Sequence, residues 1–400
     1  MLVDYASVVN PVTISGEKVN FVNQADHVGV TRCSSGNLLN IEHRITAHKK
    51  CLALIASAGL ARGHRSNIAA ALRVHRLYAL PVLFSGIASL VLNKKELSIL
   101  DKHYKETIQN IQKLHSATSR SVVFLLAGTL PAEAVLHCRQ LGLLSMICRL
   151  KDNPLNHHAK YALTHYSKSS QSWFIAIHNL CLQYRLPHPL TLLDQPPKKG
   201  VFKKEARLRI TDYWQSIFRF EARSLKSLAY LNPYVHSLSA PSQIWLSASS
   251  SPFETAKAVV VARIISGRYL CENLRAHWLN DKGYCQASSC GDVVGDIGHI
   301  LIHCPALDAM RDKMYILWKT KTENCLPELY DILLRVKTFS PSYLVHFLVY
   351  PCAFPEMILL RQTYGYKIIE HVNYLAWTYI FNLHNERQKM IEDQKKITHL

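Results

Sequence analysis

The sequence lacks the motifs of several enzyme classes. It contains no pair of adjacent aspartates, no glycine-rich phosphate loop, no serine nucleophile elbow and no His-Glu-x-x-His pattern. Two-metal phosphoryl transfer needs clustered carboxylates, and the other three patterns carry nucleotide binding, acyl transfer and zinc proteolysis. We therefore expect no enzymatic activity, with a nuclease built from acids scattered along the chain as the alternative.

A secretion signal and a long apolar run are also missing. The first residues lack the basic start and apolar core of a signal peptide. Residues 77–93 carry no charge, but they include Pro81 and Gly86 and fall short of the roughly 20 residues of a spanning helix. We expect this stretch to be buried core, with a membrane segment as the alternative, and we expect no membrane partner.

The cysteines argue against a secreted disulfide framework. There are 11 of them, an odd number, scattered along the chain except for one cluster. Free thiols in this pattern are typical of a reducing compartment, so we expect a nuclear or cytoplasmic location.

What the chain has in excess is positive charge. Its 400 residues carry 47 Lys+Arg against 28 Asp+Glu, a formal net charge of +19, while 48% apolar content excludes a mainly disordered chain. Such an excess suits a polyanionic partner, because phosphate contacts release counterions. RNA or single-stranded DNA is the expected partner; an anionic membrane or a merely basic protein are the alternatives.

The pattern of apolar residues predicts a mostly α fold with a short β element at the N-terminus. Short strands around a turn are expected within residues 12–22, and helical periodicity begins near Ile41. Leu97, Leu100, Tyr104 and Ile108 recur every three or four residues and predict an amphipathic helix. We predict segments 1–40 (short strands), 41–185 (a helical domain), 186–252 (a linker and a basic helical region), 253–320 (a zinc-knuckle module) and 321–400 (C-terminal helices).

The cysteine cluster is the most informative feature. Cys285, Cys290, His299 and Cys304 follow the spacing C-x4-C-x8-H-x4-C. Three thiolates and one imidazole are a common tetrahedral set for structural zinc, and a closed set leaves no position for an activated water. The cluster predicts a structural zinc site, with incidental cysteines as the alternative. His303 is a rival ligand, but the four-residue gap from His299 to Cys304 favours His299. Small zinc knuckles often bind nucleic acid.

A basic run follows the proline-rich residues 186–200. Phe202 and Trp214 lie close to it in the sequence, and aromatic rings beside basic side chains fit base stacking and phosphate contact. A solvated helix face is the alternative. The basic run consists of Lys198, Lys199, Lys203, Lys204, Arg207 and Arg209.

Several segments resemble the C-terminal part of LINE-type (non-LTR) retrotransposon polyproteins. VNFVNQADHVGVTRCSSGNLLNIEHRITAHKKCLALI resembles the end of a reverse-transcriptase palm leading into the thumb, with residues 25–30 in the place of the "YLG" strand and Arg44-Ile45 in that of an "RI" pair. RLYALPVLFSGIASLVLNKKELSIL and AGTLPAEAVLHCRQLGLLSMICRL resemble blocks of the helical thumb. RIISGRYLCENLRAHWLNDKGYCQASSCGDVVGDIGHILIHCPAL resembles the downstream knuckle region, and the family's metal ligands fall on the four residues of the cluster.

The resemblance implies a nucleic-acid-binding remnant of a reverse transcriptase. The family's polymerase aspartates lie in a "Y/F-A-D-D" turn and an earlier strand, which cannot be placed in this chain. The alternatives are a pseudogene-like fragment without selected activity and an RNA-directed DNA polymerase subunit completed in trans by an upstream polymerase fragment. The expected phosphate or base contacts in the thumb and near the knuckle are Lys49, Lys50, Arg62, Arg65, Arg73, Arg76, Arg268, Arg275, His277 and Trp278.

Overall fold

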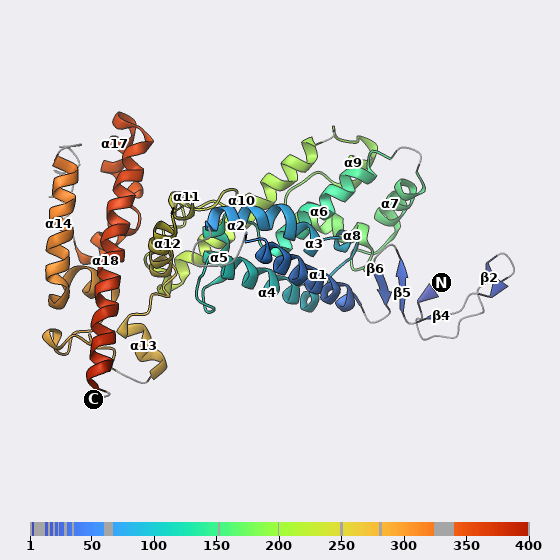
Figure 1. Ribbon diagram of the computed structural model, residues 1–400. Coiled ribbons are helices and arrows are strands. Elements are labelled where there is room, and N and C mark those ends of the chain that lie inside the picture. The colour runs from blue at the N-terminus through green and yellow to red at the C-terminus, as the bar shows by residue number, and fades with distance from the viewer. Residues whose placement is uncertain are drawn as a thin grey trace. The chain divides into compact units, whose positions relative to one another are not determined.

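The fold is mostly helical (Figure 1), which confirms the predicted fold class. The computed structural model describes residues 2–3, 13–14, 17–18, 21–22, 24–27, 30–33, 36–59, 67–150, 153–198, 200–248, 251–279, 282–323 and 340–398. The chain forms two compact units, one of residues 1–62, 71–108 and 129–217, the other of residues 63–70, 109–128 and 218–400. Each unit is described by itself.

The strands at the N-terminus form three short pairs. The longest is an antiparallel hairpin of β5 (Gln24–His27) and β6 (Val30–Cys33), with Gln24 opposite Cys33. β2 (Thr13–Ile14) is antiparallel to β3 (Glu17–Lys18), although the second strand of this pair was expected at residues 19–22 and residues 15–18 were expected to form the turn. β4 (Phe21–Val22) pairs instead in parallel with β1 (Leu2–Val3).

The first unit is built on a run of helices, and the expected amphipathic helix α4 is among them. The helices in chain order are α1 (Leu38–Ser57), α2 (Ile68–Val74), the π-turn η1 (His75–Ala79), α3 (Leu80–Leu83), the 3-10 turn η2 (Ile87–Ser89), α4 (Lys94–Ile111), α6 (Ala132–Ile147), α7 (Pro154–His165), α8 (Trp173–Gln183), α9 (Pro189–Asp194) and α10 (Val201–Ser224). The proline-rich segment expected as a linker contains α9, whose Leu192 and Leu193 are buried.

The start of α4 shows how sequence fixes a helix end. Asn93 Oδ1 accepts a hydrogen bond from the Glu96 N–H at 2.9 Å, and Glu96 Oε2 accepts one from the Asn93 N–H at 2.8 Å. This reciprocal capping box satisfies two backbone donors that a helix start leaves without intrahelical partners. Glu96 Oε1 also accepts from the Asn37 N–H at 2.7 Å, which ties α4 to the start of α1.

Burial follows the apolar stripe of α4. Leu100, Tyr104 and Ile108 are buried, so the predicted core face is confirmed. The uncharged residues 77–93 are buried in part, and Ala79, Phe84 and Ile87 are in the core. Leu77 is exposed, against the expectation of buried core, because the chain there is wound as the π-turn η1 at the surface.

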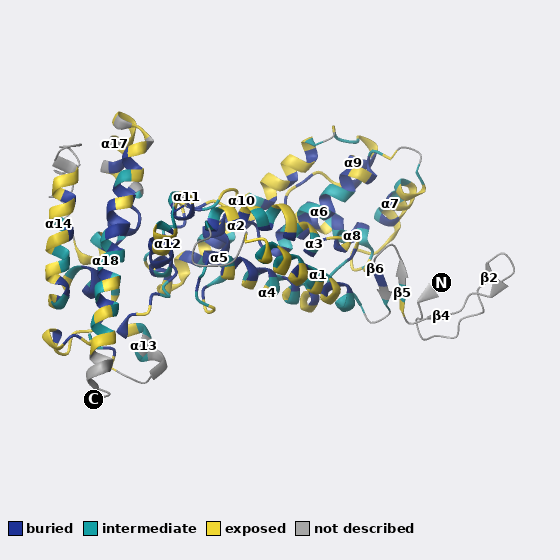
Figure 2. Cartoon of the chain, viewed as in Figure 1, coloured by how far each residue is buried: buried dark blue, intermediate teal, exposed yellow. Residues whose placement is uncertain are grey.

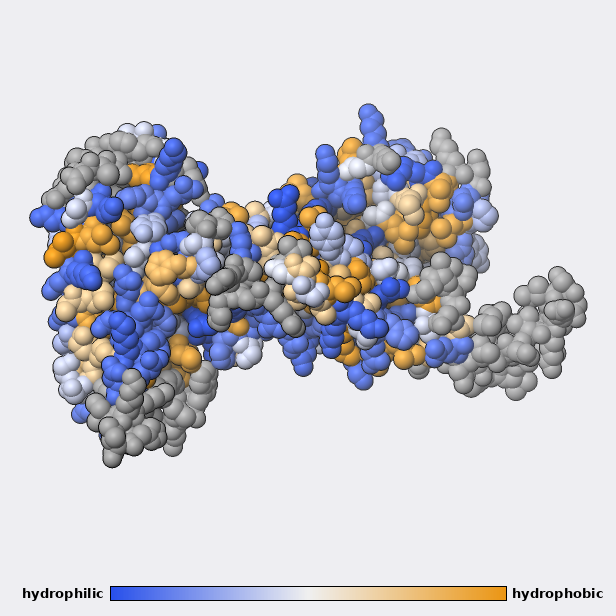
Figure 3. All heavy atoms as spheres, viewed as in Figure 1, coloured by the Kyte–Doolittle hydropathy of each residue, from blue (hydrophilic) through white to orange (hydrophobic). Residues whose placement is uncertain are grey.

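The second unit packs shorter helices along the long C-terminal helix. Its helices are α5 (Arg120–Ala127), the 3-10 turn η3 (Lys226–Leu228), α11 (Gln243–Ser247), α12 (Pro252–Ile265), α13 (Glu272–Leu279), α14 (Asp308–Glu323), α16 (Pro341–Val349), the 3-10 turn η7 (Pro351–Ala353), α17 (Pro355–Tyr364) and α18 (Tyr366–Thr398). In both units the buried residues gather where helices face one another (Figure 2). On the face drawn in Figure 3, hydrophobic patches alternate with hydrophilic side chains.

A buried lysine joins α12 to α18. Lys257 is fully buried, and its Nζ lies 2.7 Å from Glu254 Oε1 and 2.9 Å from Thr378 Oγ1. The same ammonium group lies 4.2 Å from the ring centroid of Tyr374, within the range of a cation–π contact. A buried charge is tolerated only when it is paired and hydrogen-bonded, so these contacts fix the register of the two helices.

No single helix in the described part of the chain is long and apolar enough to cross a membrane; only α5 and α6 taken together have the length and composition for one bent span.

Candidate metal centre

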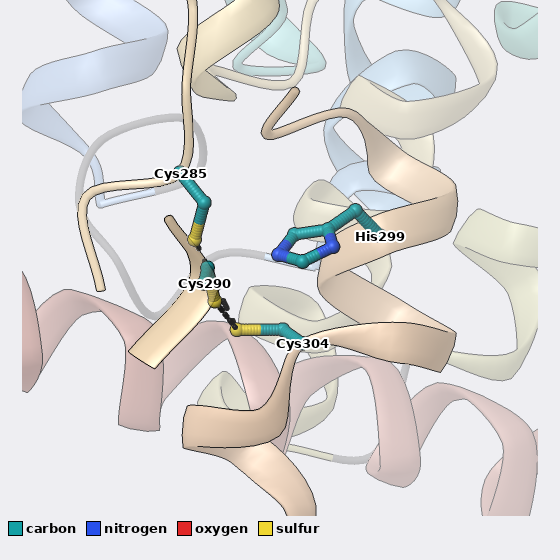
Figure 4. A group of neighbouring side chains, drawn as sticks. All are labelled: Cys285, Cys290, His299 and Cys304. Carbon is teal, nitrogen blue, oxygen red and sulfur yellow. Dashed lines mark hydrogen bonds between the residues drawn. The ribbon is translucent and has the colours of Figure 1, made fainter. Parts of the chain in front are cut away.

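Four ligand residues converge in the second unit (Figure 4). The ligand atoms of Cys285, Cys290, His299 and Cys304 all lie within 4.8 Å of one another. Cys304 Sγ is 3.9 Å from Cys285 Sγ and 3.6 Å from Cys290 Sγ. With Zn–S bonds of about 2.3 Å, the sulfurs of a regular tetrahedron would be about 3.8 Å apart. The four residues could therefore hold a metal ion, and the spacing of the thiols is compatible with zinc.

A short hairpin positions the two N-terminal cysteines. Tyr284 and Val294 form a β-bridge, the Cys285 N–H donates to the Val293 carbonyl at 2.7 Å, and the Gly295 N–H donates to the Gly283 carbonyl at 2.9 Å. Cys290 ends the 3-10 turn η4 (Ser288–Cys290) inside this hairpin. The hairpin thus brings Cys285 and Cys290 to the same site.

A π-turn positions the other two ligands. His299 begins η5 (His299–His303), its N–H donates to Asp296 Oδ1 at 2.7 Å, and the Cys304 N–H donates back to the His299 carbonyl at 2.7 Å. On an α-helix, residues five apart point about 140° away from each other. The wider π-turn lets this pair face one site, and π-turns are frequent at functional sites. The rival ligand His303 is exposed and lies outside the cluster.

Burial is the largest cause of the pKa shifts of the ligand side chains Cys285 and His299. Burial and the neighbouring thiols raise the pKa of Cys285 to about 12, against a hydrogen bond from the Ala287 backbone N–H that lowers it. Burial lowers the pKa of His299 and keeps its ring neutral. Its Nε2 is buried without a hydrogen-bond partner among the described residues, and the ring points toward the three sulfurs (Figure 4). Buried polar atoms seldom lack a partner, so this nitrogen indicates a metal ligand.

A buried ion pair supports the site from α13 and α18. Arg387 donates to Glu272 Oε1 at 2.7 Å and to the Leu270 carbonyl at 3.0 Å. The second carboxylate oxygen of Glu272 is buried without a partner among the described residues, and the charge of Glu272 raises the pKa of His299. A Cβ on Gly295 would lie 2.6 Å from that oxygen, so only glycine fits there. Glu272 and Arg387 line a cavity that also touches the ligands Cys285 and Cys304.

The C-terminal helix also holds the π-turn directly. Tyr379 donates from its hydroxyl to the Leu301 carbonyl at 2.7 Å. Arg311 of α14 donates to the carbonyl of the ligand Cys304 and pairs with Asp308. The ligands thus lie on loops, but the loops are anchored to helices, as precise metal sites require.

The predicted nucleic-acid contacts are mostly surface residues spread over several elements. Burial lowers the pKa of Arg76 of η1, and the charge of Arg207 of α10 lowers it further, so these two predicted contacts lie near each other. Arg268 is half-buried in the second unit. Arg62, Arg65 and Lys199, and the side chains of Arg275, His277 and Trp278, lie outside the described residues. The exposed members are Lys49, Lys50, Arg73, Lys198, Lys203, Lys204, Arg207 and Arg209.

The aromatic residues expected to stack on bases are in the core. Phe202 is 2% exposed and Trp214 is 6% exposed, and the Trp214 indole donates to the Tyr184 hydroxyl at 3.2 Å. They share the buried face of α10, opposite its exposed lysines and arginines. The expectation of base stacking by these two rings is therefore wrong.

Sequence reasoning missed two clusters. The first is a chain of imidazoles, in which His48 Nδ1 lies 2.9 Å from His103 Nε2 and His48 Nε2 lies 3.2 Å from His75 Nε2. These residues are far apart in the sequence, and no local signal joins them. The second is a group of exposed aromatic and arginine side chains at the end of α10, around Phe220. Phe220 lies only two residues from the buried Phe218, so the two side chains cannot share one face of the helix. Helical periodicity could therefore have predicted that Phe220 is exposed.

Fold and site together define a mostly helical protein with a candidate Cys3His metal centre. Comparisons with protein-family models, with curated proteins and with solved structures find no match for the chain. Its function is therefore argued from its residues and their geometry.

Proposed function

We propose that the chain binds RNA or single-stranded DNA and that zinc maintains the part of the second unit that carries the Cys3His centre. We further propose that it corresponds to the palm edge, thumb and knuckle of a LINE-type reverse transcriptase, on the resemblance described above. The observation that carries the proposal is the convergence of three thiols and one imidazole nitrogen in a chain of net charge +19. That nitrogen has no hydrogen-bond partner in the described part of the chain.

The metal in this proposal is structural. Three thiolates and one imidazole complete a tetrahedron, and no position is left for a reacting water. Residues 282–307, called the metal module below, contain only short turns and one β-bridge. A segment of this kind has too little core of its own, so binding of the ion supplies its folding free energy.

The phosphate contacts are assigned to helices, because the metal module itself is not basic. Lys282 is its only lysine, and it also contains Asp292 and Asp296. By contrast, α10 exposes Lys203, Lys204, Arg207 and Arg209 within three turns. Basic side chains at this density neutralise several phosphates, and the binding constant should fall steeply with salt.

The test is binding of the zinc-loaded chain to labelled RNA and single-stranded DNA over a salt series. The charge variant Lys203→Gln/Arg207→Gln should weaken binding and reduce the salt slope by about two, one for each phosphate contact removed. The variant Cys285→Ser/Cys290→Ser should lose zinc and bind more weakly. Absence of binding at low salt by the zinc-loaded wild type would contradict the proposal.

A further inference from the structure

The end of α10 and the turn that follows carry a cluster of aromatic and arginine side chains, in which Arg219 is half-buried and the other members are exposed. It consists of Arg219, Phe220 and Arg223 of α10 and Tyr234 of the following turn, and we call it the arginine–aromatic surface. Phe220 is 77% exposed and Tyr234 is 54% exposed. The guanidinium carbons of Arg219 and Arg223 lie 5.2 Å and 4.8 Å from the centroid of the Tyr234 ring.

The surface is held in place by the fold. Arg219 and Arg223 are four residues apart on α10 and therefore point to the same side of the helix. The Tyr234 N–H donates to Asn232 Oδ1 at 3.1 Å, and Leu228 and Leu231 are buried and anchor the segment between helix and turn. The cation–π contacts then join the turn to the helix, so the rings and charges are arranged before any ligand arrives.

The chemistry of the surface indicates its ligand. Residues 218–236 contain Arg219, Arg223 and Lys226 but only one acid, Glu221, whose carboxyl is partly buried. Phe220 makes no ring contact with any described residue. An open aromatic face beside guanidinium groups can stack on a base while the charges meet the adjoining phosphates.

We propose that the arginine–aromatic surface is a stacking site for unpaired bases of single-stranded nucleic acid. This inference rests on the proposed function and adds the strandedness of the ligand and the residues that select it. A base inside a duplex has both faces covered by its neighbours, so the surface discriminates against double strands. The positive charge distinguishes this surface from a purely apolar docking site, which would need no arginines.

The experiment measures the affinities of a single-stranded oligonucleotide and of the duplex of the same length for the zinc-loaded full chain. Phe220→Ala/Tyr234→Ala should weaken single-strand binding about tenfold or more and change duplex binding little, because each stacked base is lost without loss of charge. Phe220→Trp should retain single-strand affinity. Arg223→Gln should reduce the salt slope, which Phe220→Ala should leave unchanged.

Leu208→Ala is the matched control, because Leu208 is 60% exposed on the same helix but carries no ring. Equal single-strand affinity of wild type and Phe220→Ala/Tyr234→Ala, both folded by circular dichroism, would overturn the stacking site while leaving the proposed function intact. Absence of binding by the wild type itself would instead contradict the proposed function. If sedimentation shows self-association that these variants abolish while nucleic-acid affinity is unchanged, the surface is a contact between copies of the chain and the proposal is overturned.

Discussion

Helix α4 and the metal module differ in the interactions available to stabilise them. α4 buries Leu100, Tyr104 and Ile108 along one face and caps its own start through Asn93 and Glu96. The metal module has a β-bridge, a 3-10 turn and a π-turn. At its centre three thiols contact one another, and the buried Nε2 of His299 has no hydrogen-bond partner among the described residues. Under the proposed function, the comparison sets structure stabilised by apolar burial against structure stabilised by a bound ion.

Removal of the metal should have the largest effect of the predicted changes. The loss of structure should be confined to the metal module and should not reach α4. In Cys285→Ser/Cys290→Ser we expect loss of zinc binding, on the order of 10 kcal/mol of binding free energy for a structural site. Backbone amides of residues 282–307 should then exchange rapidly with solvent, while those of α4 remain protected. Hydrogen exchange with zinc quantification measures both.

Cys51→Ser is the control for that experiment, because Cys51 is a free cysteine in the first unit. It should change neither zinc content nor exchange. Unchanged protection of residues 282–307 after complete loss of zinc would show that the module folds without an ion.

A substitution in the core of the first unit should lower the stability of that unit and leave the metal module unchanged. Leu100→Ala removes a fully buried side chain of α4 and should lower the free energy of unfolding of the first unit by about 3 kcal/mol. Zinc affinity should stay at the wild-type value. Urea unfolding followed in parallel with zinc titration tests this, with the exposed Leu208→Ala as control; a matching loss of zinc affinity would show that the two regions are energetically coupled.

The sequence predicted the parts of the molecule that depend on local pattern. The stripe of α4 follows from apolar spacing, and the four ligands follow from residue type and spacing. The four-residue gap between His299 and Cys304 also favoured His299 over His303, and the cluster contains His299. The π-turn that lets His299 and Cys304 face one site was not predicted.

Local sequence patterns did not predict which aromatic side chains are exposed or which residues meet in tertiary contacts. Trp214 and Phe220 both lie near basic residues, yet one is in the core and the other is exposed, because α10 turns about 100° per residue. The contacts of His48 with His75 and His103 join three elements, η1 and α4 included, and arise only when the first unit packs.

That histidine chain makes the first unit sensitive to acid. Burial and the charges of Arg76 and His103 lower the pKa of His75 to about 4 from its ordinary value of 6.5, and burial with the charges of His75 and His103 lowers that of His48 to about 3. The unfolded chain therefore takes up protons first as the pH falls below about 6.5, and stability present above that pH is lost toward pH 4. Lys49 adds a further positive charge near His103.

We expect the buried His75 alone to account for about 2 kcal/mol of unfolding free energy lost between pH 7 and pH 5. Urea unfolding at the two pH values should show a smaller difference for His75→Gln than for the wild type. His157→Gln, at an exposed position on α7, should keep the wild-type difference. An equal pH dependence in wild type and His75→Gln would contradict this account.

The smallest expected effect is on zinc affinity, through the ion pair that joins Glu272, near the metal module, to Arg387 of α18. Glu272 is held by Arg387 of α18 through Oε1, and its charge acts on His299. The charge of a nearby carboxylate increases the basicity of a ligating imidazole, and loss of such an outer group typically lowers metal affinity 10- to 100-fold. Because glutamine keeps the shape and an oxygen for Arg387, Glu272→Gln should lower zinc affinity about tenfold, or about 1.4 kcal/mol, with the Cys3His ligand set intact.

Competition with a chelator measures that affinity, and the thiolate-to-metal absorption of the cobalt-substituted chain reports whether all three cysteines still bind. Asp292→Asn is the matched control, since Asp292 is an exposed acid in the same loop. If Glu272→Gln and Asp292→Asn lower the affinity equally, the effect is one of net charge. If only Glu272→Gln lowers the affinity, helix α18 contributes to the metal site through this carboxylate. Helix packing and metal binding then stabilise the metal module together.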